Sequence, residues 1–567
     1  MARSAYSVFS TFVISALLLF PGWGAHPGRV LTVGATFTVN SPVDLPDSDV
    51  GDGVCNTSIG KCTLRAAIDQ ANFTAGADTI ILPAGVFLLT RPGLDDVNVL
   101  GDLDISQSLT IQGAGSGATI VDGNGAVTGD RVFQILSSAV NTTISGLTVR
   151  NGKRTATFDE GGGIYWDGSG NSHLTLTNVV VRNNAGYYGG GIYLNYYTSG
   201  DVVDLGHVTV HGNTATASAG GIGVSFGDYA TFNLHDSQVD TNSAYEGGGV
   251  YFQGAAGTIT GFFTSIVHTL IFANTASLSA GFENHSGNAA FPVLLQNSKI
   301  YQNHATGYGG GIGNYGNLTV ANTTLDANTA TTKGGGLYDY EGGVVNINQS
   351  TVSRNTSTTG GGIYTELFIH NASAVTLTNS TVSSNSASHD GAGIYADGGQ
   401  VNSFNTTISA NQILVPAGVI YAGVGGGIYK SANVGFSLEN TLVADNTHRY
   451  ATAPAVPDDC YGLVVTLGYN LIEDTANCTI FGTAPGNIYG QDPKLGPLQN
   501  SNGSTLVQVP LIGSPAINAG EVPSCTDANS AAIVIDERGV LRPESGRCDI
   551  GAVENLPFTE FMPELRK

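Results

Sequence analysis

Residues 174–193 read LTLTNVVVRNNAGYYGGGIY, and this stretch decides the fold. Short runs of apolar and β-branched residues alternate with polar ones, and Asn-Asn and Gly-Gly-Gly stand between the runs. An alternation of period two is typical of β-strands, while clustered Asn and Gly are typical of turns. An apolar stripe of helical period is missing from the stretch. The pattern therefore predicts short strands joined by tight turns.

The same pattern recurs about every 29 residues through the middle of the chain. Each unit ends on an asparagine, with an aliphatic residue three positions earlier and, in most units, a glycine run leading to an apolar residue eight or nine positions later. The asparagines are Asn184, Asn213, Asn242, Asn274, Asn303, Asn328, Asn355, Asn385, Asn411 and Asn446. Because a single unit cannot bury its own apolar face, the units must stack.

The stacking arrangement that fits is a right-handed, single-stranded parallel β-helix, an all-β solenoid with one unit of about 29 residues per coil. Equivalent residues of successive coils then lie ~4.8 Å apart, and the aliphatic residues form columns inside. The asparagines are expected to form a structural ladder at a turn, since Asn tolerates the left-handed backbone and its amide bonds to the amides above and below. A β-propeller is the alternative, but its repeat is longer, ~40–45 residues.

Composition limits the partners of the 567-residue chain. It contains 79 glycines, only 11% of its residues are charged, and its formal net charge is −23. A strongly acidic surface repels phosphate backbones, so nucleic-acid binding is not expected. Divalent cations are permitted without being required.

The N-terminal residues indicate export. Residues 8–20 form an apolar run of 13 residues behind Arg3, too short to span a bilayer and typical of a signal peptide. Residues 1–25 are therefore expected to be removed, with cleavage after Gly24, Ala25 or as late as Ala35; a buried core helix is the alternative. Since no other segment has 18 uninterrupted apolar residues, no transmembrane segment is expected in the mature chain.

Six cysteines fall as three close pairs, Cys55 with Cys62, Cys460 with Cys478, and Cys525 with Cys548. Six cysteines allow 15 pairings, of which the nearest-neighbour one is the simplest. A zinc site is the alternative, but the chain has no C-x-x-C and no matching His spacing. We expect disulfides that clip the two ends of a secreted, extracellular protein.

Several segments resemble known families. The Asn and GGGIY repeats resemble those of polymorphic outer-membrane proteins and pectate-lyase-like proteins, and CTLRAAIDQAN (62–72) looks like the CSLREA domain of secreted bacterial proteins, with Thr63 and Ala66 in place of Ser and Glu. GYNLIED (468–474), DPKLGPLQ (492–499), GSPAINAG (513–520), DERGVLRP (536–543) and CDIGAVE (548–554) are similar to the choice-of-anchor Q domain of bacterial surface proteins. These families are defined by architecture, so the resemblance implies no particular activity.

The resemblances imply an N-terminal cap at 36–76, β-helix repeats at 77–450, a choice-of-anchor Q-like domain at 451–554 and a tail at 555–567. LPFTE in the tail is similar to a sortase motif, but Glu560 stands where Gly is expected and no hydrophobic stretch follows. A covalent anchor is therefore not expected, which leaves release or non-covalent association with the cell surface.

Two constellations are candidates for chemistry. Six residues before each ladder asparagine lies a second polar column, in which His207, Asp236 and His268 occupy consecutive coils. They are a candidate metal site or catalytic acid–base array, and the alternative is a polar ladder in which His and Asp stand in for Asn. Asp102, Asp104 and Asp122 are candidate Ca²⁺ ligands, with a solvated acidic loop as the alternative. No other cofactor is expected.

The pair His389 and Asp390 looks like a catalytic dyad, but its position before a glycine run varies freely between coils, which indicates a solvated corner. Lys and Arg are sparse in the coils, and no G-x-S-x-G, H-E-x-x-H or phosphate-binding loop is present. The sequence thus favours a monomeric, non-enzymatic structure that binds glycans or other surfaces. The alternative is a polysaccharide lyase or glycoside hydrolase with substrate along a solenoid face.

Overall fold

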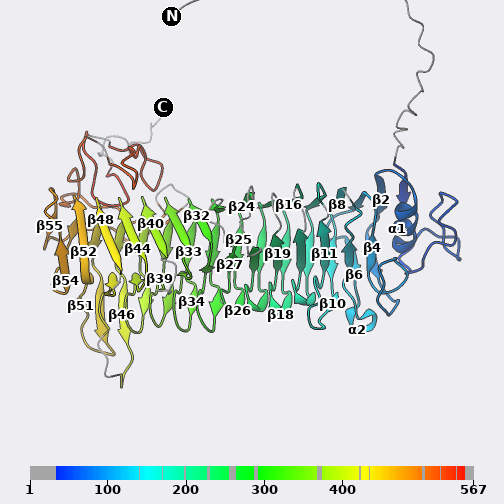
Figure 1. Cartoon of the computed structure of the whole chain (residues 1–567), viewed down its shortest axis with the longest axis horizontal. Coiled ribbons are helices and arrows are strands. Elements are labelled where there is room, and N and C mark those ends of the chain that lie inside the picture. Colours follow the sequence, from blue (N-terminus) through cyan, green and yellow to red (C-terminus); the bar gives the residue numbers. More distant parts are fainter. Residues whose placement is uncertain are drawn as a thin grey trace, which may run out of the picture.

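The computed structural model describes residues 34–139, 141–168, 170–196, 200–226, 230–254, 263–286, 292–366, 373–419, 423–432, 434–500, 505–523, 525–543 and 546–555. Here the chain winds into a parallel β-solenoid of about 12 turns with about 30 residues per turn (Figure 1). The predicted fold class is therefore confirmed. The expected signal peptide and most of the tail lie outside the described residues.

Each turn visits four faces in the order A, B, D and C, as β12, β13, β14 and β15 do. Face A consists of β1 (Thr36–Thr38), β2 (Asp78–Leu82), β5 (Leu109–Gly113), β8 (Asn141–Ser145), β12 (His173–Thr177), β16 (Val202–Gly206), β20 (Thr231–His235), β24 (Phe263–Val267), β28 (Val293–Gln296), β32 (Asn317–Ala321), β36 (Val344–Asn348), β40 (Ala374–Thr378), β44 (Gln400–Phe404) and β48 (Gly435–Glu439). Face B consists of β3 (Gly85–Leu88), β6 (Thr119–Asp122), β9 (Thr148–Arg150), β13 (Val180–Arg182), β17 (Thr209–His211), β21 (Gln238–Asp240), β25 (Leu270–Phe272), β29 (Lys299–Tyr301), β33 (Thr324–Asp326), β37 (Thr351–Ser353), β41 (Thr381–Ser383), β45 (Thr407–Ser409), β49 (Leu442–Ala444), β53 (Leu471–Ile472) and β55 (Ile488–Tyr489).

Face D is narrower, and face C carries the glycine-led strands. Face D consists of β10 (Lys153–Arg154), β14 (Ala185–Tyr188), β18 (Thr214–Ser218), β22 (Ser243–Glu246), β26 (Thr275–Leu278), β30 (His304–Ala305), β34 (Thr329–Ala330), β38 (Thr356–Ser357), β42 (Ser386–Ala387), β46 (Gln412–Val415), β50 (Thr447–Tyr450) and β51 (Val456–Pro457). Face C consists of β4 (Leu103–Ile105), β7 (Phe133–Ile135), β11 (Ile164–Gly168), β15 (Ile192–Tyr196), β19 (Ile222–Phe226), β23 (Val250–Gly254), β27 (Phe282–His285), β31 (Ile312–Asn314), β35 (Leu337–Asp339), β39 (Ile363–Thr365), β43 (Ile394–Ala396) and β47 (Ile428–Lys430). The long strand β52 (Cys460–Gly468) joins faces A and C, and β54 (Cys478–Phe481) pairs with it.

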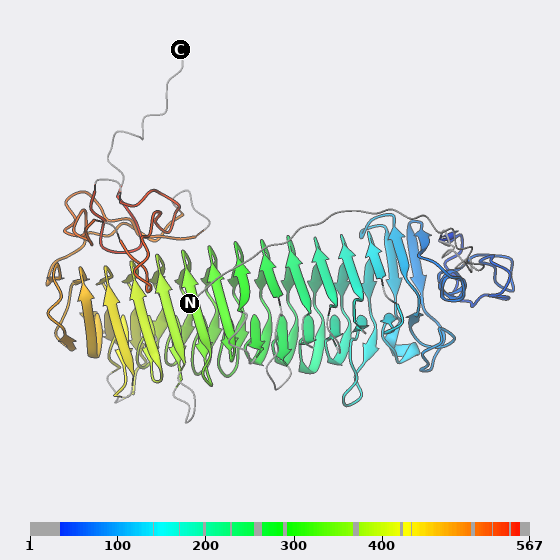
Figure 2. The ribbon, with the colours of Figure 1, turned by 45° about the horizontal axis from the view of Figure 1, so that its top comes forward.

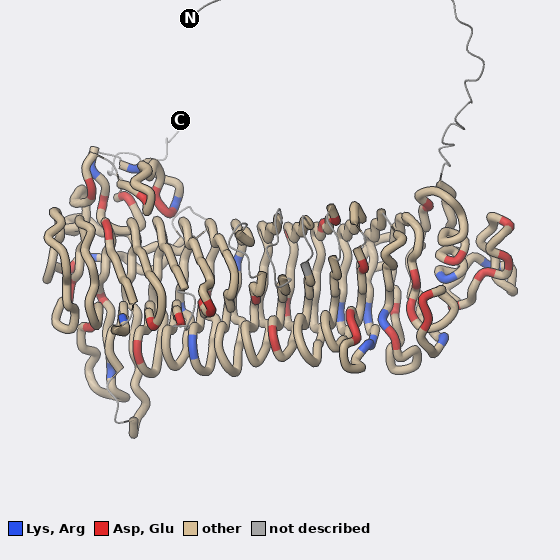
Figure 3. The backbone as a smooth tube through the Cα atoms, in the orientation of Figure 1, with Lys and Arg blue, Asp and Glu red and all other residues tan. Residues whose placement is uncertain are grey.

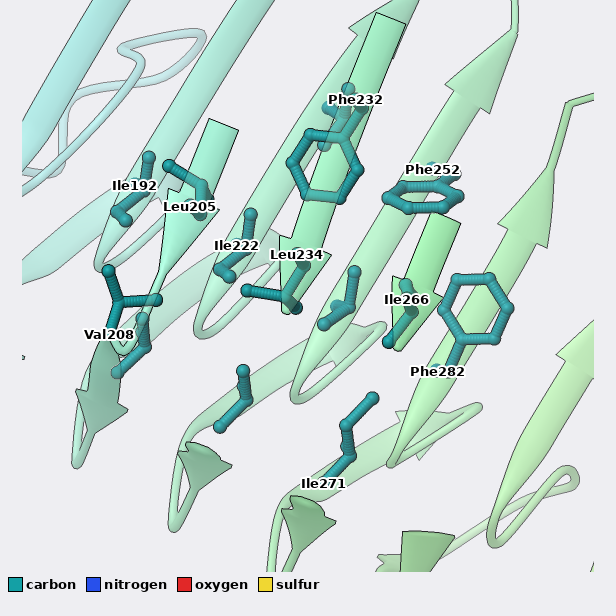
Figure 4. Packing of buried hydrophobic residues seen from close by; sticks show 14 of the residues in the cluster. Ile192, Leu205, Val208, Ile222, Phe232, Leu234, Phe252, Ile266, Ile271 and Phe282 are labelled. Carbon is teal, nitrogen blue, oxygen red and sulfur yellow. The ribbon is translucent and has the colours of Figure 1, made fainter. Parts of the chain in front are cut away.

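The interior is filled by columns of apolar side chains that repeat in register from coil to coil. Phe232, Phe252 and Phe282 pack edge to face with ring centroids 5.4 and 5.1 Å apart (Figure 4). All three are fully buried. Burial of one such ring stabilises the fold by about 1.5–3 kcal/mol relative to leaving it exposed. Stacking the coils therefore provides the buried apolar core that a single coil cannot form.

The ten predicted asparagines form a continuous hydrogen-bonded ladder between faces B and D. In each step the side-chain carbonyl accepts from both the backbone amide and the side-chain amide of the preceding asparagine, as Asn242 does from Asn213 at 2.9 and 3.0 Å. The ladder ends at Asp459, whose carboxylate accepts from both amides of Asn446 at 3.1 and 2.8 Å. Burial raises the pKa of Asp459 to about 7.

One expectation about this corner is wrong. The ladder asparagine does not adopt the left-handed backbone; the residue before it does, as shown by Asn183 with φ 55°. The glycine run has a steric cause instead. A Cβ on Gly191 would lie 2.6 Å from the Gly221 carbonyl oxygen and 3.0 Å from the Asn213 amide nitrogen. The glycines are required because the ladder and the next coil occupy that space.

Helix α1 (Leu64–Phe73) covers the N-terminal end of the solenoid (Figure 1). Thr63 caps it by accepting from the Ala66 amide, and Ile68 is fully buried against the first coils. Arg65 is buried and pairs with Asp44 at 2.6 Å. A second, short helix, α2 (Gly125–Thr128), follows β6. An apolar cap of this kind shields the end of the stack from water.

The C-terminal part contributes further coils and then folds back along the solenoid. The face B ladder continues beyond residue 450, because β49 pairs with β53 and β53 with β55. Residues 505–523, 525–543 and 546–555, called here the return segment, then lie over the later coils at the corner between faces A and B (Figure 2). The three nearest-neighbour disulfides are confirmed, with Cα atoms 5.0, 5.2 and 5.9 Å apart.

Within the part of the chain that the structure describes, no helix is long and apolar enough to cross a membrane.

Candidate functional site

The polar column that includes His207, Asp236 and His268 lies at the corner between faces A and B. All three residues adopt the left-handed backbone, with φ 53°, 51° and 49°. Asn is the usual occupant of such a position, which explains the asparagines elsewhere in the column. The three side chains are exposed and line a shallow, open hollow of about 430 Å³.

Asp236 stands at the centre of an imidazole–carboxylate cluster. His235, at the end of β20, places its Nδ1 2.9 Å from Asp236 and its Nε2 3.3 Å from Asp204. The Nδ1 of His268 lies 3.7 Å from Asp236 on the other side. The hydrogen bond from His235, followed by the charges of the neighbouring imidazoles, lowers the pKa of Asp236. His235 is a member that the repeat alone did not indicate.

The three candidate calcium ligands do not converge. Asp122 pairs with Arg150 at 2.7 Å, whereas the Asp102 carboxylate faces Arg131 at 3.7 Å. Burial, followed by neighbouring carboxylates, raises the pKa of Asp102, and burial raises that of Asp104 to about 7. As they stand, the three carboxylates do not form one ligand group among the described residues, and arginines already face two of them.

The pair His389 and Asp390 forms a structural corner. Asp390 is only 7% exposed and its carboxylate accepts from the Val424 amide of the next coil at 2.9 Å. The Nδ1 of His389 lies 3.3 Å from the Ser388 hydroxyl. The expectation that this corner is solvated is therefore wrong for Asp390, because the aspartate supports the coil that follows.

The outward residues of face C form a column of tyrosines that the sequence analysis did not identify. In register along the face lie Tyr165, Tyr193, Gly223, Tyr251, Glu283, Gly313, Tyr338, Tyr364, Tyr395, Tyr429 and Tyr461. Tyr395 and Tyr429 stack with ring centroids 4.4 Å apart, and Tyr429 and Tyr461 with centroids 5.3 Å apart. The tyrosine in GGGIY was visible in the repeat, but its outward direction became clear only from the register.

Two of these tyrosines bond to a carboxylate of the next coil, which lies two residues beyond the tyrosine of that coil. The Tyr364 hydroxyl donates to Asp397 at 3.2 Å, and the Tyr338 hydroxyl donates to Glu366. Lys333 donates to Glu366 at 2.7 Å. Burial, followed by the charges of neighbouring acids, raises the pKa of Tyr364, so the hydroxyl stays protonated. The face thus offers paired phenols and carboxylates.

One coil departs from this pattern at its corner and at its outward position. It reads SAGFE at residues 279–283, where its neighbours read GGGVY and GGGIG. Ser279 takes the left-handed corner, φ 52°, that glycine holds in most coils. Glu283 replaces the tyrosine and is fully buried, and neither carboxylate oxygen accepts a hydrogen bond of ordinary geometry from the described residues.

The surroundings of Glu283 favour its neutral form. Burial, followed by the charge of Glu246, raises the pKa of Glu283 well above the usual value, while the nearby Gly247 amide and Ser279 hydroxyl lower it. His285 lies 3.9 Å from Glu283, and burial lowers the His285 pKa to about 4. A carboxyl with a raised pKa, a neutral imidazole and a second carboxylate thus lie in one cluster. Such a combination can donate and accept protons.

Comparison with known proteins yields structural similarity alone. No family model and no curated protein sequence matches the chain. Among solved structures, pectate lyase Pel9A is 13% identical with a TM-score of 0.31 and covers 93% of this chain and 98% of its own. The mannuronan C-5 epimerase AlgE6 A-module of Azotobacter vinelandii is 13% identical with a TM-score of 0.29 and covers 80% and 100%. A GH87 α-1,3-glucanase of Streptomyces thermodiastaticus is 14% identical with a TM-score of 0.29 and covers 69% and 67%.

At these identities and TM-scores the similarities carry no inference about activity. The resemblances to the CSLREA and choice-of-anchor Q domains therefore remain predictions.

Proposed function

We propose that the protein is an extracellular glycan-binding structure that uses the tyrosine column of face C. The observation that carries the proposal is the stack of Tyr395, Tyr429 and Tyr461 in successive coils, with centroids 4.4 and 5.3 Å apart, because the first two rings are half-buried and the third is exposed. Their hydroxyls repeat with the spacing of the coils, about 4.8 Å. A long polymer of hydroxylated units matches such a repeating array better than a compact ligand does.

The chemistry of the column favours a neutral glycan. Phenolic hydroxyls donate and accept, and the accompanying carboxylates accept two or more hydrogen bonds each, so both complement sugar hydroxyls. Few basic residues lie along the coils (Figure 3), and the net charge of −23 repels polyanions. The three disulfides are typical of an oxidising, extracellular compartment.

The open end of the column is the best place to test binding. Tyr461 is 40% exposed, whereas Tyr364 is only 3% exposed. The double variant Tyr429→Ala/Tyr461→Ala is expected to weaken binding to a neutral polysaccharide at least tenfold in affinity electrophoresis or on a glycan array. The matched control is Tyr301→Ala, which removes a stacked ring from face B. Equal losses in both variants, or absence of neutral-glycan binding by the parent protein, would overturn the proposal.

A second candidate function is glycoside hydrolysis, and the Glu283 cluster is the observation that favours it. A carboxyl with a raised pKa is suited to protonating a glycosidic oxygen, and Glu246 would be the second carboxylate. Because Glu283 is fully buried, a substrate would first have to displace the side chains that cover it. The measurement is release of reducing ends from the polysaccharides that bind. Activity that Glu283→Gln abolishes while binding remains would establish hydrolysis, whereas binding without any release would leave the binding function alone.

A further inference from the structure

The corner column between faces A and B serves two different purposes along the solenoid. Over the later coils its amide side chains hold the return segment. Gln349, Asn379, Asn405 and Asn440 each donate a side-chain N–H to a backbone carbonyl of that segment, at 3.0, 2.7, 2.8 and 2.9 Å. The presence of amide side chains in these coils is therefore explained by their hydrogen bonds to the return segment.

The earlier part of the column has no such explanation. The bonds of the return segment to the column lie at Gln349, Asn379, Asn405 and Asn440, all in later coils than His268. At His207, Asp236 and His268 the side chains instead border the open hollow. Asn, Asp and His are the non-glycine residues most often found at a left-handed corner, so the backbone admits all three of these residues without choosing between an amide and an ionisable side chain. The ionisable groups at the hollow can therefore serve a ligand.

We propose that His207, Asp236 and His268 bind one divalent transition-metal ion of the Zn²⁺ class. Two imidazoles and one carboxylate are a ligand set that Zn²⁺ accepts, with a fourth position open to water or another donor. Asp236 stands between the two histidines in the coil order, and all three residues line the same hollow. With coils about 4.8 Å apart, the backbones of His207 and His268 lie about 10 Å apart, a separation that two imidazole side chains can span.

The side chains need only a small rearrangement to converge. Their nitrogen and oxygen atoms do not all meet at one point as they stand, but the His268 side chain is 58% exposed and the Asp236 side chain 44% exposed, so both can turn without unpacking the core. Asp236 already attracts His268 at 3.7 Å and His235 at 2.9 Å. The ion would replace the contact between Asp236 and His235, and Asp204, 3.3 Å from the Nε2 of that ring, would keep the ring oriented.

The test uses the full chain without an affinity tag. Isothermal titration with Zn²⁺ near neutral pH is expected to show one ion per chain, and Cu²⁺ in its place is expected to give an electron paramagnetic resonance spectrum with nitrogen coupling. The variant His207→Asn/His268→Asn is expected to lose at least tenfold in affinity and the nitrogen coupling. Because Asn occupies this position in neighbouring coils, the variant should fold normally, which circular dichroism checks.

The matched control is His304→Asn, an exposed histidine at the start of β30 that faces none of these residues. It is expected to bind Zn²⁺ like the parent protein. Asp236→Asn is expected to weaken binding while retaining nitrogen coupling from the two histidines. Failure of the parent protein to bind one equivalent, or unchanged binding in the double variant, would overturn the proposal. Neither outcome bears on glycan binding at face C.

Discussion

Replacing one asparagine in the middle of the ladder should destabilise the solenoid strongly. Asn328 is fully buried, and its side-chain carbonyl accepts from the backbone and side-chain amides of Asn303 at 3.1 and 3.0 Å. Its own amide donates to the Ile300 carbonyl and to Asn355, both at 3.0 Å. The change Asn328→Ala removes all four hydrogen bonds at once.

The expected cost follows from the groups left behind. Two donors of Asn303 lose their acceptor in a place that water does not reach, and an unpaired buried donor costs roughly 1–3 kcal/mol. The loss is therefore about 4 kcal/mol in the free energy of opening for the coil that contains Asn328. Since the stability of a solenoid is a sum over neighbouring coils, the effect should be local before it is global.

Hydrogen exchange measured by mass spectrometry is the direct assay. Amides of β33 and β37 should exchange about three orders of magnitude faster in Asn328→Ala, because about 1.4 kcal/mol corresponds to a factor of ten. The control is Asn346→Ala, an outward position on β36 between Thr319 and Thr376 of the adjacent coils. It should change stability by no more than about 0.5 kcal/mol. Similar exchange in the two variants would refute the account of the ladder.

Three further changes test other parts of the fold. Gly191→Ala should destabilise the protein by at least about 2 kcal/mol in thermal unfolding, because the new Cβ overlaps the next coil, whereas Gly117→Ala, with nothing within 4 Å, should be neutral. Burial raises the pKa of Glu439 to about 7, so the free energy of unfolding should fall as pH rises from about 4.5 to 7. Glu439→Gln should remove that fall and, after allowance for solvent screening, should be more stable than the parent protein by about 1 kcal/mol above pH 7. The two proteins should be equally stable near pH 4, which denaturation at both pH values checks. Cys525→Ser/Cys548→Ser removes a disulfide that spans a sequence separation of 23, so the free energy needed to open the return segment should fall by about 3 kcal/mol. Limited proteolysis should then cleave the return segment at temperatures that leave the coils intact.

Columns that repeat in every coil could be predicted from the sequence. The period of about 29 residues placed Val181 and Asn184 at fixed positions, and register then carried the assignment through the stack. Nearest-neighbour disulfides followed from spacing for a similar reason, since Cys55 and Cys62 are too close in sequence to separate far in space. In each case the contacting residues are a fixed number of positions apart in the sequence, so the spacing alone predicts the contact.

Features that depend on contacts without a period were missed. The return segment docks through single bonds such as that from Asn379 to the Ile535 carbonyl, across 156 residues. Nothing in the local sequence near either residue indicates that contact. The burial of Asp390 likewise depends on the course of the next coil, where the Val424 amide meets its carboxylate. The direction of a side chain was missed as well, because the repeat does not show whether Tyr395 faces the interior or the outside of the coil.

The coil with Ser279 and Glu283 shows how departures from the repeat can be weighed. A serine in the left-handed conformation costs roughly 1–2 kcal/mol that glycine would avoid, and a buried carboxyl without well-formed hydrogen bonds adds a further penalty even when neutral. The adjacent coils have glycine at the position of Ser279 and tyrosine or glycine at the position of Glu283, so the fold itself requires neither the serine nor the glutamate. Ser279 and Glu283 are thus two unfavourable residues in one coil, whereas the nine asparagine steps of the ladder are all favourable. This contrast indicates that the coil is constrained by something other than stability. Glu283 is therefore the residue to substitute first when cleavage is tested.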